Sequence, residues 1–168
     1  VQNIDNKQSE NLEGGFIINK IEQQETSFLI ELPENYKNQI HSVLKPILED
    51  WAAVPLSPTF VYGVRTYLNG SILRPHRDRV DTHIISAIIN LDQNVDEDWA
   101  LYIDDHQGNE HQVFLKAGEM IFYESARLKH SRHFPLIGES FANIFVHFEP
   151  LPVPPMPIDS PISPTFTL

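Results

Sequence analysis

The chain contains no cysteine among its 168 residues, so disulfide bonds and thiolate metal ligands are excluded. A metal site would have to use imidazole, carboxylate or neutral oxygen donors. Long apolar runs are also missing, since no stretch approaches the roughly 18 consecutive apolar residues of a membrane-spanning helix. The chain starts with VQNIDNKQSENLEGG, which is polar and acidic, unlike a secretory signal or transit peptide. The missing initiator Met suggests a fragment or processed chain. We expect a soluble protein, with the cytoplasm as the default compartment.

Basic side chains are scarce. Twelve Lys and Arg stand against 23 Asp and Glu, which gives a net charge of −11. Such a surface repels phosphate backbones, so general nucleic-acid binding is disfavoured and a basic or neutral substrate is favoured. All six arginines nevertheless lie between Arg65 and Arg132, which leaves room for a local basic groove.

Composition divides the chain into three parts. Residues 1–13 are expected to be a flexible leader and residues 14–149 a single domain. The last 20 residues contain seven of the 13 prolines, and proline lacks the N–H that a sheet requires. Residues 150–168 are therefore expected to be an extended tail or linker, with a docking ligand or self-substrate as the alternative.

The pattern of apolar residues predicts a mainly β domain with one supporting helix near its N-terminus. Residues 16–19 and 27–32 are expected to pair as two edge strands. A helix is expected to open at residues 33–35, with Pro46 kinking or dividing it. Its apolar stripe has spacings of three and four, through Tyr36, Ile40, Val43, Leu44, Ile47 and Leu48. From Thr59 to Phe148 short β-rich segments follow one another without helices, which indicates an antiparallel sandwich, jelly roll or barrel.

The segment RPHRD, residues 74–78, places a histidine and a carboxylate two positions apart. On an extended backbone His76 and Asp78 project from the same face, where they can occupy two adjacent positions of a metal ion. A third ligand must come from elsewhere in the chain. The downstream candidates are His83, His106, His111, His130, His133 and His147. Of these, His106 and His111 flank a glycine turn and are expected to be exposed, and His147 is expected to be a hydrogen-bonded core or surface residue.

His130 is the preferred third ligand, with His133 as its rival. It follows the run GEMIFYESARLK, a predicted strand and loop that would deliver it to the mouth of a barrel. Two histidines and one carboxylate on one face of an octahedron leave three open positions. This arrangement is the facial triad of non-haem iron oxygenases.

The stretch from Tyr62 to Phe148, about half the chain, resembles the prolyl 4-hydroxylase branch of the 2-oxoglutarate/iron(II) oxygenases. As in that family, a tyrosine, Tyr67, stands nine residues before the first metal histidine. A glycine turn and apolar strand, AGEMIFY, precede the distal histidine, and HSRHFPLIG and FANIFVHF follow in the family order. The resemblance implies a double-stranded β-helix, the jelly roll of these enzymes.

The resemblance also implies roles. His76, Asp78 and His130 would bind Fe(II), and Tyr67 would donate a hydrogen bond to 2-oxoglutarate. With dioxygen as second co-substrate, the enzyme would hydroxylate an unactivated C–H bond of a peptide or small molecule, with a prolyl or other amino-acid residue as first expectation.

One position departs from the family pattern. Related hydroxylases carry Lys or Arg nine or ten residues beyond the distal histidine, where this chain has Glu139 and Ser140. A buried dicarboxylate still needs a cation. Arg65, which should share an inward face with Tyr67, is the first candidate, followed by Arg132 and Arg127.

Two other functions remain open from the sequence. One is a cupin-like metalloenzyme that does not use 2-oxoglutarate, and the other is a non-catalytic jelly-roll module that binds partners through its tail. Residues 77–82 and 92–98 are either the rim of a substrate pocket or solvated acidic turns.

Overall fold

The computed structural model describes residues 7–9, 15–22 and 24–152. Their elements are β1 (Lys7–Ser9), β2 (Ile17–Asn19), β3 (Ser27–Ile30), α1 (Glu34–Ala52), β4 (Leu56–Leu68), β5 (Ser71–His76), β6 (Ile85–Val95), β7 (Leu101–Asp104), β8 (Glu110–Val113), β9 (Met120–Tyr123), β10 (His130–Arg132) and β11 (Gly138–Pro150). Within the expected leader, residues 7–9 form β1, and the rest of it lies outside the described residues. So does the expected tail beyond Pro152. In the described part of the chain, no helix is long and apolar enough to cross a membrane.

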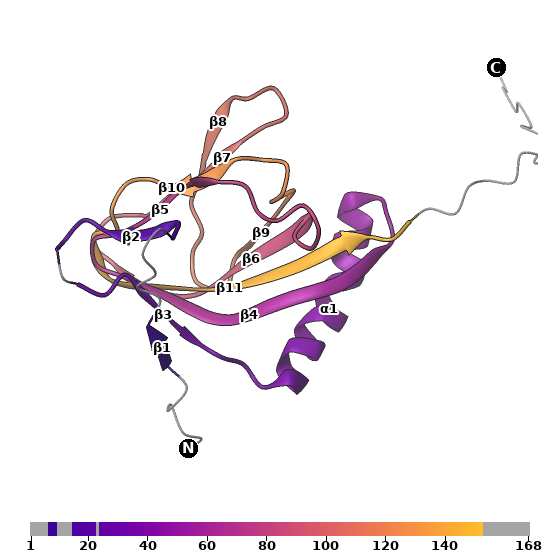
Figure 1. Cartoon of the computed structure of the whole chain (residues 1–168), viewed down its shortest axis with the longest axis horizontal. Helices are drawn as coiled ribbons and strands as arrows, with labels where there is room; N and C mark the ends of the chain where they lie inside the picture. Colours follow the sequence, from indigo (N-terminus) through magenta and orange to yellow (C-terminus); the bar gives the residue numbers. More distant parts are fainter. Residues whose placement is uncertain (1–6, 10–14, 23, 153–168) are drawn as a thin grey trace, which may run out of the picture.

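Two antiparallel sheets face each other, and α1 covers the outer side of the larger one (Figure 1). The major sheet has the order β1-β3-β4-β11-β6-β9, and the minor sheet has the order β2-β5-β10-β7-β8. Strands adjacent in space are often distant in sequence, as expected when an antiparallel sheet closes on itself as a jelly roll. The predicted jelly roll with an N-terminal supporting helix is confirmed.

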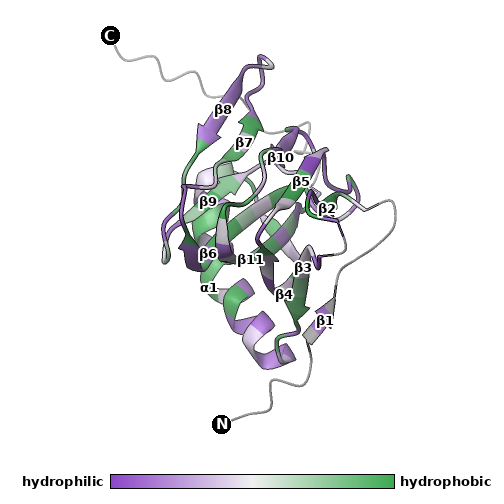
Figure 2. Cartoon of the chain, turned by 90° about the vertical axis from the view of Figure 1, so that its left-hand side faces the viewer, coloured by the Kyte–Doolittle hydropathy of each residue, from purple (hydrophilic) through white to green (hydrophobic). Residues whose placement is uncertain are grey.

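Strand β11 is buried on both faces and separates two apolar cores. Alternate side chains of a strand point to opposite faces. Phe141 and Phe145 therefore point between the sheets, whereas Val146 and Phe148 point toward α1. Figure 2 shows the strands of the major sheet mostly in the colour of apolar residues, while the edge strand β8 is hydrophilic.

Helix α1 packs against the major sheet through only one side of its apolar stripe. Leu44 and Leu48 are buried against the major sheet, whereas Val43 and Ile47 remain exposed. The helix is continuous from Glu34 to Ala52, so the predicted division at Pro46 does not occur. Burial of the surrounding turns against the sheet stabilises the helix despite the backbone hydrogen bond that proline cannot make.

The prediction that residues 16–19 and 27–32 pair with each other is wrong. β2 pairs with β5 in the minor sheet, and β3 pairs with β1 and β4 in the major sheet. Apolar pattern predicts that a strand exists but does not choose its partner, which depends here on long-range packing.

A bulge in β4 orients the side chains that later form one wall of a cavity. Gly63 has φ +102°, and a Cβ at this position would lie 2.4 Å from the carbonyl oxygen of Ile30. Only glycine tolerates both the positive φ and the close approach of β3. The bulge brings Tyr62 onto the same inner face as Arg65 and Tyr67, and all three line the cavity.

Candidate metal centre

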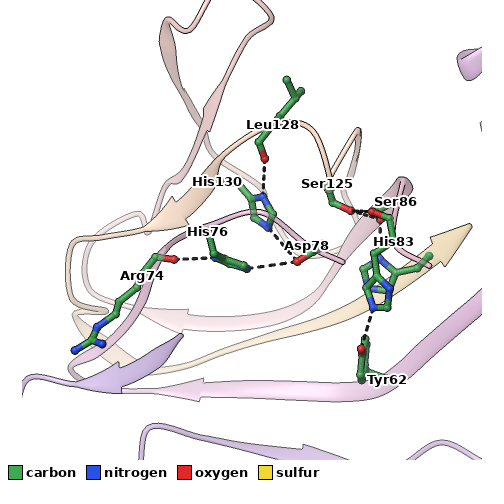
Figure 3. A network of polar contacts seen from close by, with 10 residues as sticks. Tyr62, Arg74, His76, Asp78, His83, Ser86, Ser125, Leu128 and His130 are labelled. Carbon is green, nitrogen blue, oxygen red and sulfur yellow. Dashed lines mark hydrogen bonds and ion pairs between the residues drawn. The ribbon is translucent and has the colours of Figure 1, made fainter. Parts of the chain in front are cut away.

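Strand pairing brings two of the predicted metal ligands together. His76 ends β5, His130 begins β10, and the two residues are directly opposite each other in the minor sheet. Their ring centroids are 4.3 Å apart. Asp78 follows β5 by two residues, and its backbone N–H donates to the carbonyl oxygen of Ser125 at 2.9 Å. The loop after β9 thus holds the carboxylate beside the two imidazoles (Figure 3).

Both histidines present the nitrogen that a metal would need. The Nδ1–H of His76 donates to the carbonyl oxygen of Arg74 at 2.8 Å, and that of His130 donates to Leu128 at 3.0 Å. A carbonyl oxygen can only accept, so the proton of each neutral ring lies on Nδ1 and the lone pair lies on Nε2. These Nε2 atoms are 3.5 Å and 3.7 Å from Oδ1 of Asp78. Backbone carbonyls thus orient both rings in the way that supports metal ligation.

The protonation states of Asp78 and His130 suit the binding of a cation. Burial raises the pKa of Asp78, but the neighbouring imidazoles of His76 and His130 outweigh this effect, so the pKa lies below its usual value. Burial, and next the charge of His76, lowers the pKa of His130. The carboxylate is therefore ionised and the His130 imidazole neutral near pH 7, the forms that bind metals.

The residues present fit an iron(II) site. The ligand atoms of His76, Asp78 and His130 all lie within 4.8 Å of one another, and this is the one such cluster within the described residues. Donors around a common ion lie roughly 3–4 Å apart, which these side chains reach with small movements. Imidazole and carboxylate donors suit iron, and the facing cavity has a volume of about 330 Å³.

The other candidate histidines, including the rival His133, lie outside the cluster of His76, Asp78 and His130. Its Nδ1 is hydrogen-bonded to Ser131, and its ring packs on Tyr102, 4.0 Å between centroids. His106 and His111 are largely exposed, as expected. Of the alternatives, only His83 and His147 also line the cavity.

A buried arginine, Arg132, lines the cavity. Arg132 is 2% exposed, and its guanidinium carbon lies 4.7 Å from the Trp99 ring and 4.5 Å from the Phe141 ring. Its Nη1 donates to the carbonyl oxygen of Trp99, but Nη2 has no hydrogen-bond partner among the described residues. Burial lowers the pKa of Arg132 to about 10, and the side chain remains charged near pH 7.

The departure from the family pattern at residues 139 and 140 has a structural explanation. A register shift between Gly138 and Ser140 leaves Glu139 outside the ladder with β6. Its carboxylate is exposed and accepts a hydrogen bond from the amide of Asn94 at 2.7 Å. Glu139 therefore does not face the cavity, where it would repel an anionic ligand.

The other candidate cations occupy two different environments. Arg65 lines the cavity wall between the rings of Tyr62 and Phe145, at 5.9 Å and 5.3 Å from their centroids. Arg127 is exposed and paired with Glu124 at 2.8 Å. The structure thus brings Tyr67, Arg65 and Arg132 to one cavity and leaves Arg127 outside it.

Sequence analysis missed a polar wall made by Tyr62, His83 and His147. The hydroxyl of Tyr62 lies 2.8 Å from Nε2 of His83, and the imidazoles of His83 and His147 are tilted by 31° with centroids 3.9 Å apart. These residues come from β4, the loop before β6, and β11, so no local spacing could have indicated the wall. The one available clue was the inward alternation of His147 with Phe145.

Hydrogen-bond directions fix the tautomer of His147. The hydroxyl of Ser125 donates to the carbonyl oxygen of His83 at 2.7 Å, so it accepts from Ser86 at 2.6 Å. Ser86 in turn accepts from Nδ1–H of His147 at 2.6 Å, which leaves the lone pair on Nε2. Figure 3 shows Ser125 and Ser86 of this hydrogen-bond series near His76, Asp78 and His130. The wall is therefore ordered by the same loop that holds Asp78.

No family model and no curated protein matches the sequence of this chain. Solved structures match its fold. A Pseudomonas putida prolyl-4-hydroxylase is 20% identical, with a TM-score of 0.56 over 81% of this chain and 72% of that one. A Trichoplax adhaerens prolyl hydroxylase, solved with a peptide fragment of the hypoxia-inducible factor oxygen degradation domain, is 13% identical, with the same TM-score and coverage.

A third similar structure is an oxidoreductase of the 2OG-Fe(II) oxygenase family from Burkholderia pseudomallei. It is 13% identical, with a TM-score of 0.53 over 79% of this chain and 65% of that one. At these identities the likeness concerns the fold. The chain has the fold of the prolyl 4-hydroxylase-like 2-oxoglutarate oxygenases.

Proposed function

We propose that this chain is an Fe(II)- and 2-oxoglutarate-dependent dioxygenase that hydroxylates an unactivated C–H bond. The observation that carries the proposal is the convergence of His76, Asp78 and His130 on the wall of a cavity that a buried arginine also lines. Three protein ligands on one side of an ion leave positions for a bidentate co-substrate and dioxygen. In this proposal residues 14–149 form the oxygenase domain.

Iron and 2-oxoglutarate would supply the oxidising chemistry, with dioxygen as oxidant and with succinate and CO₂ as products. The protein contributes geometry and a partly enclosed cavity. His76 and His130 are already held in the ligating tautomer by backbone carbonyls. Apolar side chains such as Ile88 and Leu101 line the deeper cavity and limit the access of water.

Arg132 is our proposed anchor for the far carboxylate of 2-oxoglutarate, with Tyr67 beside it. A buried guanidinium with an unpaired Nη2 is stabilised by an anion that accepts a charge-assisted hydrogen bond. Tyr67 is fully buried and lines the same cavity as Arg132. Arg65, the first candidate from the sequence, also lines the cavity and remains the alternative anchor.

The proposed substrate is a peptide in which a prolyl or other amino-acid residue is hydroxylated. Support comes from the fold shared with prolyl hydroxylases, one of which was solved with a peptide bound. A fold hosts many substrates, so the residue attacked is a separate question from the chemistry. A small-molecule substrate is the alternative.

The test is an anaerobic titration with Fe(II) and then 2-oxoglutarate, followed by equilibrium dialysis for the metal and by visible absorption for the chelate. We expect wild type to bind iron and develop the charge-transfer band, and His76→Ala and His130→Ala to lose iron. His133→Ala is the matched control, since its ring packs on Tyr102 away from the cluster.

Three results would overturn the proposal in different ways. Iron binding without a 2-oxoglutarate band would favour the cupin-like metalloenzyme. Failure to bind either would favour a jelly-roll module without catalysis. Equal loss of iron in His133→Ala would show that the cluster is not the binding site.

A further inference from the structure

A second groove lies on the outer face of the minor sheet. Its volume is about 280 Å³, and in the part of the chain that the structure describes it shares no lining residue with the cavity of the metal cluster. Tyr102 of β7 points into it, because its neighbours Leu101 and Ile103 point into the core between the sheets. Four aromatic and two acidic side chains line this aromatic groove, namely Trp99, Tyr102, Phe114, Phe134, Glu97 and Asp98.

Two aromatic side chains of this groove are more than half exposed, Phe114 at 53% and Phe134 at 58%. Exposed aromatic side chains that gather in one place commonly mark a site of protein–protein contact. Phe134 is already held in position, since its carbonyl oxygen accepts from the indole N–H of Trp99 at 2.8 Å. Its ring packs on the rings of Tyr102 and His133, with centroids 5.6 Å and 4.7 Å away. A ligand that packs on Phe134 therefore loses little binding energy to the ordering of this side chain.

The rim of the aromatic groove is negative. Glu97 and Asp98 are exposed, and no basic residue is among the lining residues that the structure describes. The backbone N–H groups of Asp96 and Glu97 donate to the carbonyl oxygen of Ile137 at 2.9 Å and 3.4 Å, which holds the acidic turn against the groove. Residues 92–98, expected to be a pocket rim or a solvated acidic turn, thus contribute two carboxylates to this groove, and none of them lines the cavity of the metal cluster.

This combination of groups is complementary to an arginine side chain. Carboxylates attract a cation, and the faces of aromatic rings attract it as well. A guanidinium suits both better than an ammonium, because it is planar, stacks on aromatic rings and can donate to two carboxylates at once. The rest of the groove is apolar, so a residue with an apolar side chain next to the arginine would cover the ring of Phe114.

We propose that the aromatic groove is an interaction surface for a partner protein and binds a peptide segment in which an arginine stands next to an apolar residue. The guanidinium packs on Phe134 and pairs with Glu97 and Asp98, and the apolar side chain packs on Phe114. The net charge of −11 on the whole chain favours the approach of such a segment. The proposal goes beyond the proposed dioxygenase activity and does not depend on it.

The experiment is an NMR titration of the full chain with acetyl-Gly-Arg-Leu-Gly-amide. The matched peptide carries citrulline in place of arginine, which keeps the shape of the side chain and removes its charge. We expect saturable shifts of the backbone amides of Glu97, Asp98 and Phe134, and about tenfold weaker binding of the citrulline peptide. Raising NaCl from about 50 mM to about 500 mM should weaken binding of the arginine peptide severalfold and leave the citrulline peptide nearly unchanged.

Paired variants separate a local site from the effect of net charge. Asp98→Asn is expected to weaken binding of the arginine peptide about threefold. Asp96→Asn makes the same charge change at an exposed neighbour outside the groove lining and should have little effect. Phe114→Ala should weaken binding about tenfold, and Met120→Ala, which truncates another exposed apolar side chain in the major sheet, is its control. Circular dichroism checks that each variant is folded.

Equal binding of the arginine and citrulline peptides would overturn the proposal. So would equal weakening by Asp96→Asn and Asp98→Asn, because the charge would then act at long range and not at a site. Shifts confined to the cavity of the metal cluster would also contradict it. Sedimentation equilibrium without peptide tests the remaining occupant: a dimer that Asp98→Asn dissociates would show that a second copy of this chain fills the groove, and would overturn the assignment to a partner protein.

Discussion

The guanidinium carbon of Arg132 lies 4.5 Å from the ring centroid of Phe141, in a part of the molecule where both side chains are almost fully buried. The indole of Trp99 packs near the same guanidinium, at 4.7 Å. Aromatic faces stabilise a cation but do not satisfy its N–H groups. The unpaired Nη2 therefore marks a place where an acceptor belongs.

Replacing Arg132 is expected to abolish tight binding of the co-substrate. Arg132→Gln should weaken 2-oxoglutarate about 100-fold, because it leaves a carboxylate buried without its cation. Calorimetric titration of Mn(II)-loaded protein measures this, and Mn(II) affinity itself should be unchanged. If Arg65→Gln causes the loss and Arg132→Gln does not, Arg65 is the anchor.

Stability should fall on acidification because His147 is buried in its neutral form. Burial is the main cause that lowers its pKa to about 3, against 6.5 for an ordinary histidine. Between these values the unfolded chain binds the extra proton, so the contribution is fully present above about pH 6.5 and is lost as the pH falls toward 3.

From about pH 7 to pH 5 we expect His147 to account for a loss of about 2 kcal/mol in the free energy of unfolding. Urea unfolding of metal-free protein at the two pH values measures it. His147→Asn, which keeps a donor toward Ser86, should show a smaller loss. An identical pH dependence in the variant would contradict this assignment.

The bulge at Gly63 should not tolerate a side chain. Gly63→Ala combines a φ of +102° with a Cβ 2.4 Å from the carbonyl oxygen of Ile30, so we expect a destabilisation of about 2–4 kcal/mol. Gly108→Ala is the matched control, with φ +85° but no atom within 4 Å of the added Cβ. It should cost only about 1 kcal/mol, the strain of the backbone alone. If urea unfolding shows the same loss of stability in both variants, β3 can move away from the added Cβ at position 63 without a measurable cost.

The two sides of α1 should respond differently to truncation. Leu48 is 0% exposed and Val43 is 65% exposed on the same helix. Leu48→Ala should lower the free energy of unfolding by about 3 kcal/mol, and Val43→Ala by less than about 0.5 kcal/mol. A large loss at Val43 would mean that this surface is covered in solution.

The proximity of His76, Asp78 and His130 could be predicted from the sequence, and their binding of a metal stays a prediction. His76 and Asp78 are two residues apart at a strand end, and a resemblance in the order of motifs selected His130. The expectation that Arg65 would share an inward face with Tyr67 also follows from strand alternation, and the structure places both in the cavity lining.

The environment of Arg132 and the polar wall could not be predicted. Arginine is rarely fully buried, so composition favours an exposed site for it. The wall joins Tyr62 to His83 and His147 only because a glycine bulge shifts the register of β4. The shift lies in the pairing of β4 with β11, and the alternation of apolar residues within β4 does not give its position.

The two-sided burial of β11 makes the cavity between the sheets and the helix-covered core parts of one cooperative unit. Because β11 contributes side chains to both cores, its unfolding removes packing from both at once. Loosening α1 by heat or by truncation at Leu48 should therefore release a bound metal in the same transition that unfolds the sheet. Calorimetry should accordingly record one peak for the domain, shifted as a whole when the cluster is loaded.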